Sequence, residues 1–256
     1  MTDDIELQSA NTAAAYQYAV AFHSEFEGRN PYQVSVIFEL HAIISKDLYD
    51  FAGQERTAIH EVEIGGASIT PAPAYLIKSG LVDLCEDVAK RAGADLSFDD
   101  AVRLSAELLH RLLVIHPFQD GNGRTARAFH LMALYDLGLL TPPLHIFDYV
   151  AYRRSEYLEC LHEADEGDYE PLCEYIRRGL YDTIEQLIAN AVSGGPYREF
   201  YMRRLNRKAK RFLDRRYRLG LTGTTYERER RHFLRSITRV AQAASLHEGQ
   251  HRNPEG

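Results

Sequence analysis

Apolar residues recur every three or four positions along most of this chain, which is the spacing of amphipathic helices. The clearest example is the run from Ala101 to Ile115, which follows Ser97 and Asp99 as candidate N-caps. The same pattern, with Gly28 and Gly93 as stops, predicts helices over residues 8–27, from Pro31 to about Leu48, over 76–92 and 101–115, from about Arg124, and over 152–163 and 171–191.

One segment departs from helical spacing. His60 to Gly66 shows a short alternation of apolar and polar residues around a glycine pair, and it predicts a small β-hairpin. The sequence therefore predicts an all-α fold with one small hairpin.

The end of the chain differs from the rest in charge. From Pro196 onward there are 16 Lys and Arg against 6 Asp and Glu, a net charge of +10, so the overall −7 leaves −17 for residues 1–195. Ser193 to Pro196 has the composition of a linker. We expect an N-terminal helical segment (1–30), a core domain (31–192) and a basic helical extension (196–256) with a disordered end. The extension could bind nucleic acid, dock on an acidic surface or be a solvated helical hairpin.

Composition narrows the class of protein. The 256 residues contain no apolar run near the ~18 residues of a membrane span. Three of the first six residues are acidic and none is basic, which is atypical of a secretory signal. The three cysteines lack metal-site spacing and are expected to be reduced and buried. We therefore expect a cytoplasmic protein without a membrane partner.

Residues 116–127, His-Pro-Phe-Gln-Asp-Gly-Asn-Gly-Arg-Thr-Ala-Arg, carry the candidate chemistry. Gly121, Asn122 and Gly123 allow backbone N–H groups to converge at a helix N-terminus, which is a site for anions. Arg124 and Arg127 share one face of the first helical turn. Asp120 is a ligand type suited to Mg²⁺, and His116 can serve as a base near neutral pH. The string is equipped to hold a polyphosphate with a divalent metal.

Two other interpretations fit parts of this string. Residues 121–126 also fit the dinucleotide pattern G-x-G-x-x-G/A, but a helix rather than a strand is predicted before them. A plain turn between two helices would explain the glycines, although not a histidine, an aspartate and two arginines in register.

The string resembles the motif of the Fic family, H-P-F-x-[D/E]-G-N-G-R-x-x-R, at every fixed position. The wider resemblance extends over roughly residues 10 to 190, and it implies a Fic-type helical core that transfers AMP from ATP to a Ser, Thr or Tyr hydroxyl of a target protein. In that role His116 would be the catalytic base, and Asp120 would hold Mg²⁺. The phosphates of ATP would be bound by Gly121, Asn122, Gly123, Arg124 and Arg127.

Further segments resemble other parts of the family. The predicted hairpin, with Glu63, Ile64, Gly65 and Gly66, resembles the flap that binds the target backbone. Tyr157, Leu158 and Asp165 correspond to the adenine side, although Leu158 replaces a Tyr and Asp165 an Asn that are common there. Glu27 resembles the glutamate of an inhibitory helix, where it would pair with Arg127; here His23 replaces the usual Ser or Thr.

Two alternative functions follow from the same residues. The chain could be a nucleic-acid-associated regulator with an inactive Fic-like core, or it could transfer a different phosphate-containing group. The sequence leaves the target protein and the oligomeric state open.

Overall fold

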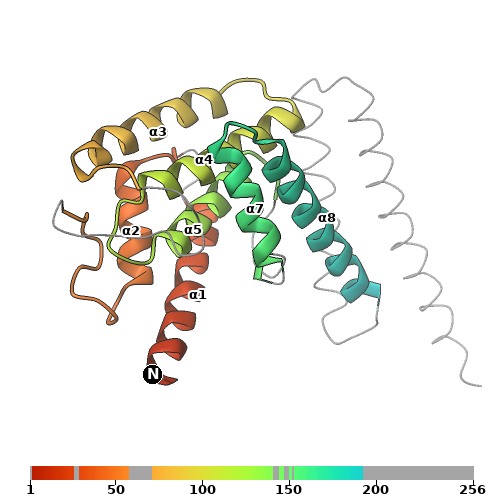
Figure 1. Cartoon of the computed structure of the whole chain (residues 1–256). Coiled ribbons are helices and arrows are strands. Elements are labelled where there is room, and N and C mark those ends of the chain that lie inside the picture. The colour runs from red at the N-terminus through yellow and green to blue at the C-terminus, as the bar shows by residue number, and fades with distance from the viewer. Residues whose placement is uncertain are drawn as a thin grey trace, which may run out of the picture. The chain divides into compact units, whose positions relative to one another are not determined.

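The computed structural model describes residues 2–25, 29–57, 71–140, 144–146, 150–151 and 153–192. Within them the chain forms seven α-helices, one short 3₁₀ helix and no strand (Figure 1). The elements are α1 (Thr2–Glu25), α2 (Val34–Ile44), η1 (Ala74–Leu76), α3 (Ile77–Ala92), α4 (Phe98–Ile115), α5 (Asn122–Asp136), α7 (Arg154–Asp165) and α8 (Glu170–Val192). The predicted all-helical character is confirmed for these residues.

The predicted hairpin at residues 60–66 and the basic extension at 196–256 lie outside the described residues. The chain divides into two compact units, residues 1–177 and 178–256. The candidate site lies in the first unit, as do all the interactions reported below.

The central helix of the first unit is α5, which packs against α1, α2 and α4. Every residue from Ala128 to Tyr135 is buried, including His130, so this part of the helix is enclosed on all sides. A helix enclosed in this way belongs to the interior of a protein rather than to its surface. The segment 116–127 thus leads directly into a buried central helix.

The preceding helix, α4, begins where the sequence predicts. Ser97 Oγ accepts a hydrogen bond from the Asp100 backbone N–H at 3.1 Å, and the Asp100 carboxylate accepts one from the Ser97 N–H at 3.3 Å. This reciprocal capping box satisfies two donors that the first helical turn leaves unpaired. On its other side, α4 is covered by α3.

The helix that begins after Pro31 is shorter than predicted. It ends at Ile44, and Leu48 lies in the turn that follows. Asp47 adopts a φ of 58°, which reverses the chain after α2. The reversal brings Tyr49, which stacks on Phe51, back to Asp120 in the segment 116–127.

Two expectations from composition concern the three cysteines and a membrane span. Cys85, Cys160 and Cys173 are buried and form no disulfide, as expected. None of the helices that the structure describes has the length and apolar character needed to cross a membrane.

Candidate functional site

His116 occupies the C-terminal cap of α4 in a left-handed conformation, with φ 49° and ψ 60°. Its side chain is buried, and Nδ1 lies 3.1 Å from the Leu113 carbonyl oxygen. A carbonyl can only accept, so Nδ1 carries the proton and Nε2 is the basic nitrogen. Burial, and to a lesser degree the charge of Arg56, lower the pKa of His116, although the Leu113 carbonyl and Asp120 oppose this. The imidazole is therefore neutral and able to accept a proton at pH 7.

Gly121 makes the tight turn between the two helices. It has a φ of +78°, and a β-carbon there would stand 3.4 Å from the His41 ring and from Ser45 Oγ. Glycine is required because side-chain-bearing residues rarely adopt this φ. As predicted, α5 begins directly behind this turn, at Asn122.

Asp120 precedes the turn with a side chain that is 55% exposed. Oδ2 accepts a 2.6 Å hydrogen bond from the Tyr49 hydroxyl, and Oδ1 accepts one from the Gly121 N–H and lies 3.5 Å from Arg124 Nη2. Burial opposes ionisation, but these contacts outweigh it and hold the pKa of Asp120 below its usual value. Lone pairs on both oxygens remain for a metal, so an ionised, accessible carboxylate fits the predicted Mg²⁺ role.

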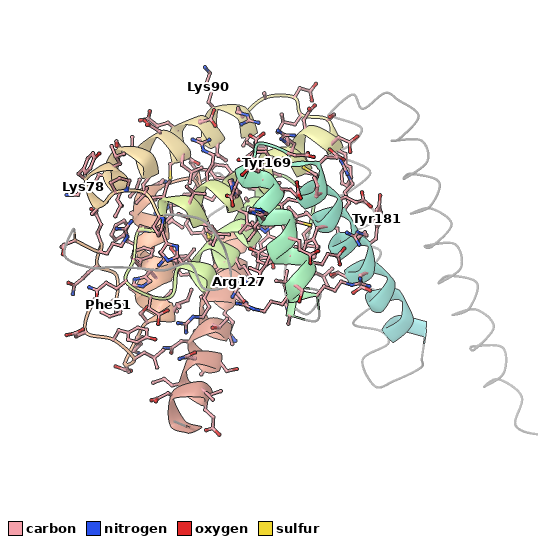
Figure 2. The ribbon with its side chains drawn as sticks, viewed as in Figure 1. Phe51, Lys78, Lys90, Arg127, Tyr169 and Tyr181 are labelled. Atoms are coloured by element: carbon pink, nitrogen blue, oxygen red, sulfur yellow. The ribbon has the colours of Figure 1, made fainter. Side chains whose placement is uncertain are left out.

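Sequence reasoning missed the support that α2 and the following turn give to Asp120. His41 is fully buried, its Nδ1 accepts a 2.9 Å hydrogen bond from the Gly53 N–H, and its Nε2 donates one of 3.0 Å to the Asp120 carbonyl. Its ring stacks on Phe118 with centroids 3.7 Å apart. On the same turn, Tyr49 stacks on Phe51, which Figure 2 labels, at 4.7 Å. The only signal in the sequence was the Glu39-Leu40-His41 run and its inward histidine.

Asn122 braces the motif loop from within. Its Oδ1 accepts from the Phe118 N–H at 2.9 Å, and its Nδ2 donates to the Phe118 carbonyl at 2.7 Å. We expected the Asn122 side chain to donate a hydrogen bond to a phosphate. In the structure both of its polar atoms bond the Phe118 backbone and hold the loop closed. A phosphate contact from the Asn122 backbone N–H stays a prediction.

The two arginines sit differently. The Arg124 side chain is 17% exposed, and its Nη1 is buried with no hydrogen-bond partner among the described residues. Buried guanidinium nitrogens are normally paired, so this one suits an anionic ligand. Arg127 turns back over the first turn of α5, where Nη1 would be 3.3 Å from a β-carbon on Gly123. The charge of Arg127, which Figure 2 labels, also acts on the Tyr157 hydroxyl of α7.

The residues predicted for the adenine side are engaged with protein. Asp165 binds His110 Nε2 at 2.6 Å, so its carboxylate is held within the fold rather than presented to an amine. Tyr157 is 4% exposed and packs on Tyr175 with ring centroids 5.6 Å apart. Leu158 is half-buried on the same helix. Nucleoside contacts by these three residues stay predictions.

The remaining predicted site residues fall outside the described part of the chain: the inhibitory candidate Glu27 and the flap residues Glu63, Ile64, Gly65 and Gly66. The structure does bring together His116, Asp120, Gly121, Gly123, Arg124 and Arg127 around one turn between α4 and α5.

Comparison with known proteins agrees with this arrangement. Residues 30–134 match the Fic/DOC family. The protein adenylyltransferase fic-1 of Caenorhabditis briggsae is 31% identical over 140 residues, 54% of this chain and 25% of its own length. A probable protein adenylyltransferase of Aquifex aeolicus, aq_aa38, is 33% identical over 109 residues, 42% of this chain and 30% of that protein. The matches thus span about a quarter to a third of these relatives.

Solved structures show the same fold at low identity. A Fic family protein from Desulfovibrio desulfuricans G20 superposes with a TM-score of 0.58 at 18% identity, covering 87% of this chain and 65% of that one. Fic-1 of Caenorhabditis elegans, residues 134–508, gives 0.57 at 22% identity, covering 74% and 54%. Residues 30–134 therefore match a Fic/DOC family domain, and the described helices have a Fic-like fold.

Proposed function

We propose that this protein is a Fic-type adenylyltransferase that transfers AMP from ATP to a hydroxyl side chain of a target protein. The observation that carries the proposal is that one turn joins a buried His116, with Nε2 as its basic nitrogen, to Arg124, whose Nη1 has no hydrogen-bond partner among the described residues. A base and an anion-binding group are then both present at one turn. The names of the relatives support the same activity.

The proposed reaction assigns a task to each of the grouped residues. His116 Nε2 takes the proton of the target hydroxyl while the hydroxyl oxygen forms a bond to the α-phosphorus of ATP. The bond from that phosphorus to the oxygen bridging to the β-phosphate breaks, and pyrophosphate leaves. Because Nδ1–H already donates to the Leu113 carbonyl, the imidazolium that forms keeps a hydrogen bond. The protein thus holds the base in one tautomer before substrate arrives.

The phosphates would be held by the start of α5. Arg124 and Arg127 offer guanidinium donors, and the N–H groups at Gly121–Gly123 face the end where a helix attracts anions. Magnesium, when bound, would neutralise charge on the α- and β-phosphates, with Asp120 as its protein ligand. Catalysis would come mainly from this fixed charge and from positioning. Inhibition by Glu27, through a pair with Arg127, belongs to the same proposal.

The experiment is incubation of the full chain with isotopically labelled ATP, Mg²⁺ and cell lysate, followed by mass spectrometry of modified proteins. The expected result is an AMP adduct on Ser, Thr or Tyr with wild type and none with His116→Ala, while both proteins bind ATP. An adduct of different mass would identify another transferred group. Equal adduct yields from both proteins would exclude His116 as the base.

A further inference from the structure

The last turn of α4 is tied to a single buried arginine. Arg56 is 5% exposed, and its Nε donates to the His116 carbonyl at 2.6 Å. Its Nη2 donates to the Ala72 carbonyl and lies 3.5 Å from the Ile115 carbonyl. One guanidinium thus contacts carbonyl groups at the end of α4 and the carbonyl group of Ala72.

The backbone adds two further ties at the same place. The Arg56 N–H donates to the Pro117 carbonyl at 2.9 Å, and the Ala72 N–H donates to the Val114 carbonyl at 3.0 Å. Carbonyls at the end of a helix lack partners inside the helix. Here the carbonyls of residues 114–117 all have donors near them from Arg56 or Ala72.

His116 needs such support because of its backbone. A left-handed φ crowds the β-carbon of any residue other than glycine, so it persists only where the surroundings fix it. In the described chain only Asp47 shares this feature among non-glycine residues. The carbonyl that Arg56 binds most closely is that of His116 itself.

Arg56 forms no ion pair with a carboxylate among the described residues, although the charge of the neighbouring Glu55 acts on it. Its positive charge meets the negative end of the α4 dipole. Burying a cation without a paired carboxylate is costly, and an apolar residue would fill this space at a lower desolvation cost. What an arginine adds here is a set of donors for the carbonyl groups at the end of α4.

We propose that Arg56 is a positioning residue for His116: it fixes the left-handed backbone of His116 and so sets where the imidazole stands when it takes the proton. The inference rests on the proposed AMP transfer. None of the Arg56 contacts among the described residues reaches Gly121–Gly123, so we expect a substitution of Arg56 to affect the transfer step rather than ATP binding.

The test compares Arg56→Met, Arg56→Lys and a control, Arg103→Met. Arg103 pairs with Glu107 on α4 and lies outside the motif contacts. Calorimetry with a non-hydrolysable ATP analogue gives the fraction of each protein that can bind ATP. Transfer rates are divided by that fraction, so that partial unfolding of a variant is not mistaken for slower transfer. We expect Arg56→Met to slow transfer about 100-fold, as misplacement of a reacting group by about 1 Å does. Its affinity for the analogue should stay within about twofold of wild type, and Arg56→Lys should fall between Met and wild type.

A second measurement needs no activity. In nucleotide-free protein, NMR titration of the His116 imidazole should give a higher pKa in Arg56→Met than in wild type, since a neighbouring positive charge is removed while Asp120 remains. Three results would each overturn the assignment. They are an Arg56→Met transfer rate equal to that of wild type, a loss of analogue binding as large as the loss of transfer, and a His116 pKa that is the same in Arg56→Met and wild type. A wild type that binds the analogue but modifies nothing would refute the proposed function alone, and the NMR result would still decide the role of Arg56.

Discussion

The Tyr49 hydroxyl donates a 2.6 Å hydrogen bond to Oδ2 of Asp120, although 71 positions separate the two residues. Tyr49 is held in turn by its stack on Phe51. The carboxylate that would hold the metal is therefore oriented by a residue outside the motif. Partners of this kind affect metal affinity nearly as much as the ligands do.

Tyr49→Phe removes only that hydroxyl and keeps the ring stack. We expect the Mg²⁺ concentration needed for half-maximal ATP binding to rise about tenfold, the lower range seen for loss of such partners. Calorimetric ATP titrations at a series of Mg²⁺ concentrations measure it. The control is Tyr75→Phe, which removes a hydroxyl from a ring that is 82% exposed. Unchanged Mg²⁺ dependence in Tyr49→Phe would show that Asp120 needs no support from this turn.

The pH dependence of transfer should report His116. Burial and Arg56 place its pKa below 6.5, so the basic form predominates at neutral pH and is lost only as pH falls through that lowered value. We expect the transfer rate to change little around neutral pH and to fall, with the titration of one group, at a pH below the ordinary pKa of a histidine. Stopped assays with saturating ATP measure the profile. A rate that declines steadily from pH 7.5 would contradict a neutral, buried base.

Asn122→Ala should destabilise the fold as well as the site. It leaves the buried N–H and carbonyl of Phe118 without their partner. Each unsatisfied buried group costs about 1–3 kcal/mol, so a loss of about 2–6 kcal/mol in the free energy of unfolding is expected for the two groups. Urea denaturation measures it, with Gln119→Ala in the same loop as the control. A loss below about 0.5 kcal/mol, the usual range for surface substitutions, would mean that the loop does not depend on this amide.

His41 should make the protein sensitive to acid. Burial lowers its pKa to about 4, against 6.5 for the free side chain. Between these values the unfolded chain binds a proton that the folded chain does not, so stability falls as pH drops from 6.5 toward 4. The loss from this group should approach about 3 kcal/mol.

The measurement for His41 is the free energy of unfolding in urea at several pH values between 7 and 4. His130, fully buried with its pKa lowered to about 3, acts in the same direction. His41→Phe should therefore flatten part of the slope, whereas the exposed His162→Gln should not. Parallel slopes for wild type and His41→Phe would assign the acid sensitivity elsewhere.

Glu27→Gly tests the inhibitory segment. If Glu27 pairs with Arg127, removing the carboxylate frees the guanidinium for the γ-phosphate, and modification should rise at least tenfold, equivalent to about 1.4 kcal/mol. The readout is the initial rate of adduct formation. The matched control is Glu6→Gly, at an exposed position of α1. A rate within about twofold of wild type, with ATP binding intact, would make Glu27 an ordinary surface residue.

The fold was predictable where one helix face is apolar. The capping residue of α4, the span of α3 and the buried Phe118 follow from local spacing and size. The end of α2 did not follow, because apolar spacing continues to Leu48 although the helix ends at Ile44 and Asp47 takes a left-handed backbone conformation in the turn that follows. Local pattern carries no information on a turn that is stabilised by distant contacts.

The candidate site divides in the same way. The residues proposed to hold the phosphates and the metal are contiguous in sequence, and they were predicted from their chemistry. The residues that support them, such as His41, Tyr49 and Arg56, make contacts across the fold that no local pattern reveals. The engagement of Asp165 by His110 was likewise invisible, because it depends on α4 and α7 meeting at that point.

The support of the motif turn by His41 has a consequence for transplantation. The hydrogen bond to the Asp120 carbonyl and the ring stack on Phe118 come from a helix that ends more than 70 residues before the turn. A graft of residues 116–127 between two helices of another scaffold would carry over the residues proposed to hold the phosphates and the metal, but not their supports. We expect such a chimera to bind nucleotide weakly until counterparts of His41 and Tyr49 are built in from outside the graft. A portable unit of this site would therefore include α2 and the turn after it as well as α4 and α5.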